Sequence, residues 1–145
     1  MVTFQLALMA KLKAGNKALP SETQCKATLN AMADALYVIG GKWKLRIIVA
    51  LTAGNKRFNE LQRLVQGISA KVLSTELKEL ELNGFVRRIV FTGSPVIIEY
   101  ELSEYAETLD AVLQSLSEWG AMHREKIRKS MKKKKLAEIS KPAIL

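Results

Sequence analysis

Two cations and two hydroxyls share one face of a predicted helix in the middle of the chain. Lys71, Ser74, Thr75 and Lys78 recur at intervals of three and four residues, which brings them together on a helix. Ammonium groups attract phosphates, and hydroxyls can exchange hydrogen bonds with base edges in a DNA groove. We call these four residues the polar face. An ordinary solvated helix carries such residues too, so the neighbouring elements must decide between the two interpretations.

The helix that carries the polar face has clear signals at both ends. Ser69 is a good N-cap, the helix is expected to run to Asn83, and Gly84 stands where a left-handed residue often ends a helix. Three leucines on another face should dock on the preceding helices: Leu73, Leu77 and Leu80. Three acids should point away from the polar face: Glu76, Glu79 and Glu81.

Apolar periodicity predicts three helices before this one. They are expected over residues 25–39, 43–51 and 58–65, and they end at Gly40-Gly41, Gly54-Asn55 and Gln66-Gly67. Trp43 and Phe58 are expected in the core, and Asn59 is expected near the start of the third helix, where its side chain can accept from free backbone N–H groups.

A hairpin and a long helix are predicted after it. Residues 85–91 and 96–102 are rich in β-branched and aromatic residues and flank turn chemistry at Thr92–Pro95. Ser103 opens a last helix that can exceed twenty residues, with Leu109, Val112, Leu113, Leu116, Trp119 and His123 along one face. The fold class is thus mainly α with a small β-hairpin (α+β), in the order of a winged helix-turn-helix. The hairpin cations Arg87 and Arg88 could reach DNA flanking the polar face.

Length indicates one domain with ragged ends, and most of the excess positive charge lies in the C-terminal tail. The chain of 145 residues carries a net charge of +9, and residues 121–145 hold +7 of it. We divide it into an arm (1–24), a winged-helix domain (25–123) that includes the start of the long helix, and a basic tail (124–145). The run Lys132–Lys135 could touch phosphates, but such runs are commonly only solvated. The apolar stretch Val2–Ala10 is too short for a membrane span, and one cysteine fits a reducing cytoplasm.

The sequence holds few side chains that could carry out catalysis. His123 is the only histidine, and no phosphate loop, metal-ligand cluster or nucleophile elbow is visible. We therefore expect no enzyme, catalytic residue, metal or cofactor. The remaining alternative to DNA binding is a winged-helix module that binds another protein, which would tolerate replacement of the polar face.

Several short motifs together resemble the HxlR-type regulators, a winged-helix family related to the MarR regulators. The matching residues are Cys25, Gly40-Gly41-Lys42-Trp43, Arg57–Leu61, Ile68–Leu80, Gly84, Glu99-Tyr100-Glu101-Leu102 and Trp119-Gly120. The resemblance covers about residues 25–123. Two departures stand out: Pro95-Val96-Ile97 replaces a cation of the family's wing, and Lys26 follows Cys25 where the family has proline.

The resemblance implies a prokaryotic homodimer whose two recognition helices enter successive major grooves of a pseudo-palindromic operator. The implied DNA-binding residues are Arg57, Ser69, Lys71, Ser74, Thr75, Lys78, Arg87 and Arg88. The implied dimerisation residues are Leu109, Val112, Leu113, Leu116 and Trp119. Some relatives sense oxidants through a cysteine at the place of Cys25, and Lys26 could favour the reactive thiolate there. A plain, partly buried thiol is the competing interpretation, and no small-molecule effector can be named.

Overall fold

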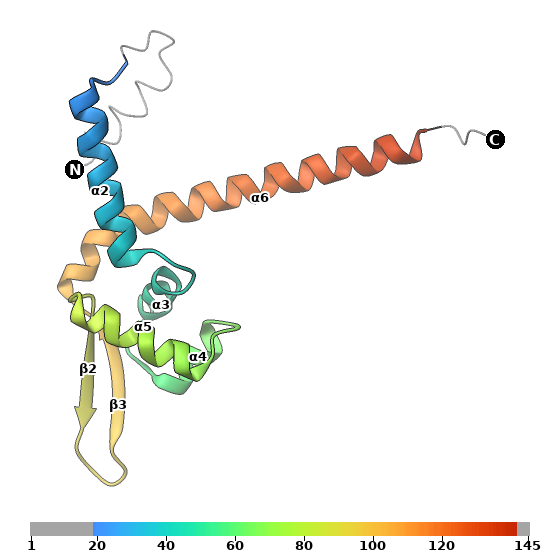
Figure 1. Ribbon diagram of the computed structural model, residues 1–145. Helices are drawn as coiled ribbons and strands as arrows, with labels where there is room; N and C mark the ends of the chain where they lie inside the picture. The colour runs from blue at the N-terminus through green and yellow to red at the C-terminus, as the bar shows by residue number, and fades with distance from the viewer. Residues whose placement is uncertain (1–18, 142–145) are drawn as a thin grey trace. The chain divides into compact units, whose positions relative to one another are not determined.

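The computed structural model describes residues 19–141 in two units that divide at Gly40. Most of the predicted arm, including Val2–Ala10, and the last four residues of the predicted tail lie outside the described residues. The first unit contributes one described helix, α2 (Glu22–Ile39), and the second contributes all other elements (Figure 1).

Helix α2 begins three residues before the predicted start at Cys25. The reason is a capping box: the backbone N–H of Gln24 donates to the Ser21 hydroxyl, and the Ser21 N–H donates to Oε1 of Gln24. None of the residues of α2 is buried, and its apolar side chains Leu29, Met32 and Leu36 are all exposed.

Three helices form the centre of the second unit: α3 (Lys44–Leu51), α4 (Phe58–Leu64) and α5 (Ala70–Leu82). Their buried apolar residues are Ile47, Ile48, Leu51, Leu61, Leu73, Leu77 and Leu80. The predicted docking of the three leucines of α5 is therefore confirmed. Trp43 and Phe58 are only half-buried, because both stand at the ends of short helices and not inside them.

The caps of these helices agree only partly with the prediction. Ser69 caps α5 by accepting from the Val72 N–H at 3.2 Å, and Gly84 has the expected positive φ of 80°. At α4, however, the capping acceptor is Glu60 and not Asn59: the Arg57 N–H donates to Oε2 of Glu60 at 2.7 Å. A carboxylate in the first helical turn also meets the positive end of the helix dipole.

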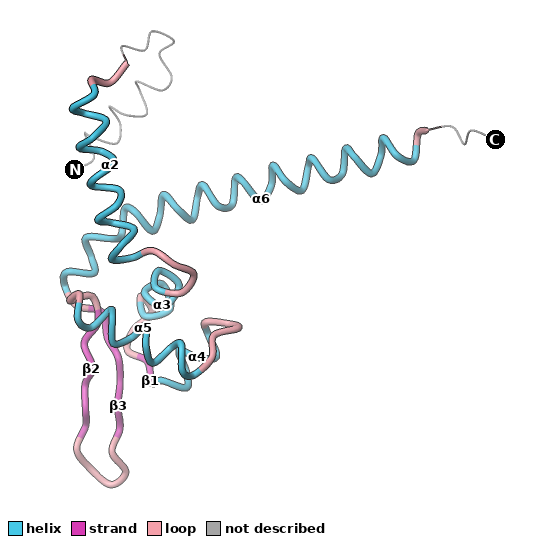
Figure 2. Tube along the Cα trace, in the orientation of Figure 1, coloured by secondary structure: helices cyan, strands magenta, loops and turns pink. Residues whose placement is uncertain are grey.

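The predicted hairpin is part of a three-stranded antiparallel sheet (Figure 2). Strands β2 (Val86–Phe91) and β3 (Ile97–Leu102) pair from Val86↔Leu102 to Phe91↔Ile97. The two-residue strand β1 (Lys56–Arg57) adds to the other edge of β3, opposite Tyr100 and Glu99. The sequence analysis missed β1, since two residues are too few to show a strand periodicity.

The C-terminal segment begins with a 3₁₀ helix, η1 (Glu104–Leu109), and continues as α6 (Asp110–Ile139). The Ser103 hydroxyl does not cap η1 and instead donates to the Gly84 carbonyl. Helix α6 has 30 residues and extends through most of the predicted tail, so the lysine run is helical. The fold is mainly helical with a small sheet and a long last helix, as predicted.

Candidate nucleic-acid interface

The polar face lies on the outer side of α5. Lys71, Thr75 and Lys78 are exposed and Ser74 is half-buried, while the leucines of the same helix are inside. Within residues 19–141, neither Lys71 nor Lys78 forms an ion pair. The face therefore presents two uncompensated cations beside two hydroxyls.

Local hydrogen bonds restrict what the hydroxyls can offer a ligand. The Thr75 hydroxyl donates to the Lys71 carbonyl at 3.1 Å, so its oxygen remains an acceptor and its methyl group remains exposed. The Ser69 oxygen already accepts from the Val72 N–H, which leaves its proton free to donate. Thr75 thus suits an amino group or a methyl group of a base edge, and Ser69 suits a phosphate oxygen at the start of α5.

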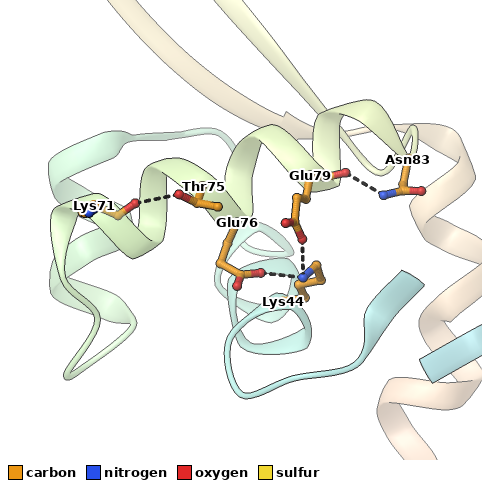
Figure 3. A network of polar contacts seen from close by, with 6 residues as sticks. All are labelled: Lys44, Lys71, Thr75, Glu76, Glu79 and Asn83. Carbon is orange, nitrogen blue, oxygen red and sulfur yellow. Dashed lines mark hydrogen bonds and ion pairs between the residues drawn. The ribbon is translucent and has the colours of Figure 1, made fainter. Parts of the chain in front are cut away.

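Two of the three acids of α5 are drawn away from the polar face by one lysine of α3 (Figure 3), whereas Glu81 is exposed and forms no ion pair within residues 19–141. Nζ of Lys44 lies 2.8 Å from Oε2 of Glu76 and 2.6 Å from Oε2 of Glu79. The side chains of Lys44 and Glu76 are only 12% and 19% exposed, so their ion pair is poorly screened by water, whereas Glu79 is 48% exposed. The expectation for Glu76 and Glu79 is confirmed, and Lys44 is a supporting residue that the sequence analysis missed.

The charge on Lys44 is stabilised by its two partners. Burial on its own lowers the pKa of this lysine, but the pull of Glu76 and Glu79 outweighs burial and raises the pKa above its usual value of 10.5. The buried Oε2 of Glu76 interacts with the ammonium group as an ion pair and not as a well-aligned hydrogen bond. We call the pairing of Lys44 with Glu76 and Glu79 the clamp. Because Lys44 is charged at neutral pH, the clamp holds α5 on α3 there.

Trp43 braces the turn between α4 and α5. The backbone of Gly67 in this turn has a φ of 88°, and a Cβ placed there would lie 3.8 Å from Cη2 of Trp43. Arg46 lies over the Trp43 ring, 5.0 Å from its centroid, and donates to the Gln66 carbonyl at 3.2 Å. Trp43 thus lies beside this turn, and Arg46 links the tryptophan ring to the turn's backbone.

The hairpin cations do not act as one pair. Consecutive residues on a strand point to opposite faces of the sheet, so Arg87 and Arg88 are separated, although both are exposed. Nε of Arg87 lies 3.0 Å from Oε1 of Glu101, directly opposite on β3, which offsets its charge. Arg57, on β1, is exposed and stands opposite Glu99. Arg88 is the less compensated cation of the hairpin.

The residues on either side of the hairpin turn are apolar. Phe91 and Val96 are exposed there, and Ile97 is half-buried as the cross-strand partner of Phe91. At Pro95-Val96-Ile97, where the HxlR-type pattern carries a cation, this hairpin has none, as the sequence indicates.

Three of the five expected dimerisation residues are free on the surface of α6. Val112, Leu116 and Trp119 are 41%, 48% and 58% exposed, and the Trp119 ring stacks on His123 with centroids 5.0 Å apart. Leu109 is instead buried within its own subunit, and Leu113 is half-buried. The exposed residues recur every three or four positions and form an apolar stripe on one side of the helix.

Cys25 lies in the first turns of α2 with an exposed thiol, and not partly buried as the competing interpretation supposed. The neighbouring Lys26 is engaged by Glu22, with Nζ and Oε1 2.8 Å apart. The positive charge expected to act on the thiol is therefore shared with a carboxylate.

The described part of the chain shows no cluster of three or more potential metal ligands. None of its helices combines the length and the apolar character that crossing a bilayer requires. Neither observation adds a competing site to the one on α5.

A family model described as HxlR-like helix-turn-helix matches residues 38–128, well over half of the chain. The chain belongs to this family. Among curated relatives, the uncharacterised HTH-type transcriptional regulator YtcD of Bacillus subtilis is 48% identical over 92 residues, which is 63% of this chain and 73% of YtcD. This HxlR-type chain is thus a transcriptional regulator and not an enzyme.

Solved structures of related regulators share the fold. The structure of YtcD has a TM-score of 0.62 at 47% identity, covering 65% of this chain and 96% of that one. The redox regulator HypR in its oxidised form has a TM-score of 0.61 at 38% identity, covering 63% and 95%. The reduced form of YodB from Bacillus subtilis has a TM-score of 0.56 at 39% identity, covering 61% and 87%.

Proposed function

We propose that this HxlR-type regulator binds a specific duplex DNA sequence through the polar face of α5. The observation that carries the proposal is the separation of charge on this helix. Lys71 and Lys78 face outward without an acid partner, while Glu76 and Glu79 are held inward by Lys44. A helix with this distribution can bring Lys71 and Lys78 against phosphates while two of its three carboxylates are engaged by Lys44. The third, Glu81, is exposed and unpaired among the described residues. Because its ligand is chromosomal DNA, we place its action in the cytoplasm.

We assign a role to each contacting residue from the chemistry of its side chain and from its place on α5 or on the sheet. Thr75 and Ser74 are placed to meet base edges, Lys71 to meet a base edge or a nearby phosphate, and Lys78 to meet the backbone. Ser69 and the first N–H groups of α5 are placed to bind a phosphate. Arg57, Arg87 and Arg88 add backbone attraction around this centre, and Arg87 adds least because Glu101 already compensates it.

We further propose that two copies act together on a pseudo-palindromic operator. The stripe of Val112, Leu116 and Trp119 is apolar, exposed and helical, which suits burial against the same stripe of a second subunit. Two recognition helices would then enter successive major grooves, with half-sites about one helical turn apart. The proposed dimer contact excludes Leu109, which its own subunit buries.

The experiment is selection of bound fragments from the source genome with the full chain, followed by fluorescence anisotropy on an enriched fragment. We expect binding that survives a scrambled competitor and falls at least about tenfold for the double variant Ser74→Ala/Thr75→Ala, equivalent to the loss of one good base contact. A matched control is Ser117→Ala, a serine on α6. If no fragment is enriched, the chain is a protein-interaction module, and the double variant should bind its partner unchanged.

A second candidate property is oxidant sensing by Cys25. It is supported by the exposed thiol near the start of α2 and by the similarity of the chain to the redox regulator HypR. Treatment with diamide should release the operator from the wild type but not from Cys25→Ser. Equal release from both proteins, or from neither, would remove Cys25 from the mechanism.

A further inference from the structure

The last part of α6 is a strongly basic helix that the polar face does not require. We call residues 124–139 the basic extension. It holds eight Lys or Arg and two Glu, and all of its cations are exposed. The family match ends at residue 128, so most of the extension lies beyond the shared domain. At 1.5 Å per residue the extension is about 24 Å long.

Most of this charge has no acid partner. The ion pair between Arg128 and Glu125, at 3.1 Å, is the one that the structure shows within residues 124–139. Lys132–Lys135 are consecutive, and at about 100° per residue they present ammonium groups on all sides of the helix. On one of these sides they continue a stripe begun by Arg124 and Arg128. A polyanion can therefore be contacted over the whole length of the extension.

The pattern does not suit a protein or membrane surface. Lysine is depleted in protein interfaces, and two such extensions side by side would repel each other. A helix lying in a membrane interface needs one apolar face. Here the exposed apolar residues Ile127, Met131, Leu136 and Ile139 spread over about 180° around the helix, with Arg128, Lys132 and Lys135 among them.

We propose that the basic extension binds the phosphate backbone of duplex DNA without reading its sequence. Duplex DNA carries about one charge per 1.7 Å, or about 14 charges along the length of the extension. The extension would add a sequence-independent attraction to the specific contacts of α5. This inference rests on the proposed DNA binding of the chain, but not on its sequence specificity.

The test compares two full-length variants at the same five positions: Lys129, Lys132, Lys133, Lys134 and Lys135. One variant changes all five to Gln, which keeps helix propensity but removes charge, and the control changes all five to Arg. Anisotropy on a random 30-base-pair duplex is measured from 50 to 300 mM salt. We expect the Gln variant to bind at least about tenfold more weakly at 100 mM salt. Its slope of log affinity against log salt should be shallower by about 0.9 for each phosphate that the variant no longer neutralises.

The Arg control should retain the wild-type affinity and slope. An unchanged slope in the Gln variant would overturn the inference, as would a variant that loses binding only to vesicles containing phosphatidylserine. The two proposals can fail separately. If the wild type prefers one sequence and the Gln variant matches its affinity, the extension is inert while sequence-specific regulation stands. If the wild type prefers no sequence but the Gln variant binds all duplexes more weakly, the basic extension binds DNA and the proposed sequence specificity fails.

Discussion

The ammonium group of Lys44 lies 2.8 Å from the carboxylate of Glu76, across the contact between α3 and α5. Glu79 approaches the same ammonium group one turn further along α5. The pairing does two things at once: it fastens α5 to α3, and it gives two carboxylates of α5 a cationic partner on the side away from the polar face.

Replacing Lys44 should therefore destabilise the fold. In Lys44→Met, the largely buried Glu76 loses its ion-pair partner. We expect the free energy of unfolding to fall by about 1–3 kcal/mol. This is less than the loss expected for a fully buried pair, because the second partner, Glu79, is half-exposed. Urea denaturation measures the loss. Lys26→Met is the matched control, since Lys26 and Glu22 are also 2.8 Å apart but 71% and 83% exposed, and it should change little. If Lys44→Met and Lys26→Met lost the same free energy of unfolding, burial of the ion pair would not explain the effect.

The same clamp predicts a dependence on alkaline pH. The pKa of Lys44 is raised in the folded state above its usual 10.5. A group with a raised pKa contributes its full stability below the unfolded value and loses it as pH rises through the folded value. The gap in unfolding free energy between wild type and Lys44→Met should be constant from pH 7 to 9. It should narrow above about pH 10.5, and a gap that widens there would contradict the assignment.

The turn between α4 and α5 should depend on glycine at position 67. With a φ of 88°, Gly67→Ala forces an ordinary side chain into a left-handed conformation and should cost about 1 kcal/mol in unfolding free energy. Crowding adds little, because the new Cβ meets Trp43 at an ordinary distance. Gly67→Asn should cost less. Gly93→Ala, in a turn without positive φ, is the control and should be nearly neutral; a similar loss at both glycines would refute the backbone explanation.

The proposed dimer should depend on the apolar stripe of α6. Leu116→Lys puts a charge into the middle of that stripe, and we expect the dimer dissociation constant to rise at least about tenfold in sedimentation equilibrium. Ser117→Lys adds the same charge about 100° around the helix and should leave the constant nearly unchanged. Dimers of normal stability with Leu116→Lys would place the interface elsewhere.

Free and compensated cations should contribute differently to DNA affinity. Lys78→Gln should reduce the salt slope of binding by about one, because the uncompensated ammonium group that neutralises a phosphate is removed. Arg87→Gln should reduce it by less, since Glu101 already offsets the guanidinium charge at 3.0 Å. Both variants keep the core intact. A larger effect at Arg87 would mean that its ion pair opens when DNA binds.

Many elements of this fold could be predicted because their signals are local. The leucines of α5 recur at helical spacing, Ser69 can accept from backbone N–H groups three residues later, and Gly84 can adopt a positive φ. These are properties of a few neighbouring residues. The separation of Arg87 and Arg88 likewise follows from the two-residue period of a strand.

The sequence by itself therefore determined the five α-helices and the hairpin within residues 19–141, though not the two-residue strand β1, and which four residues share the polar face. Only the tertiary structure decided what lies beside them: the edge pairing of β1, the burial of Leu109 inside its own subunit, and the capture of Glu76 by Lys44. These contacts join residues that are distant along the chain. Their energy depends on how helices and strands pack, and no local spacing encodes that packing.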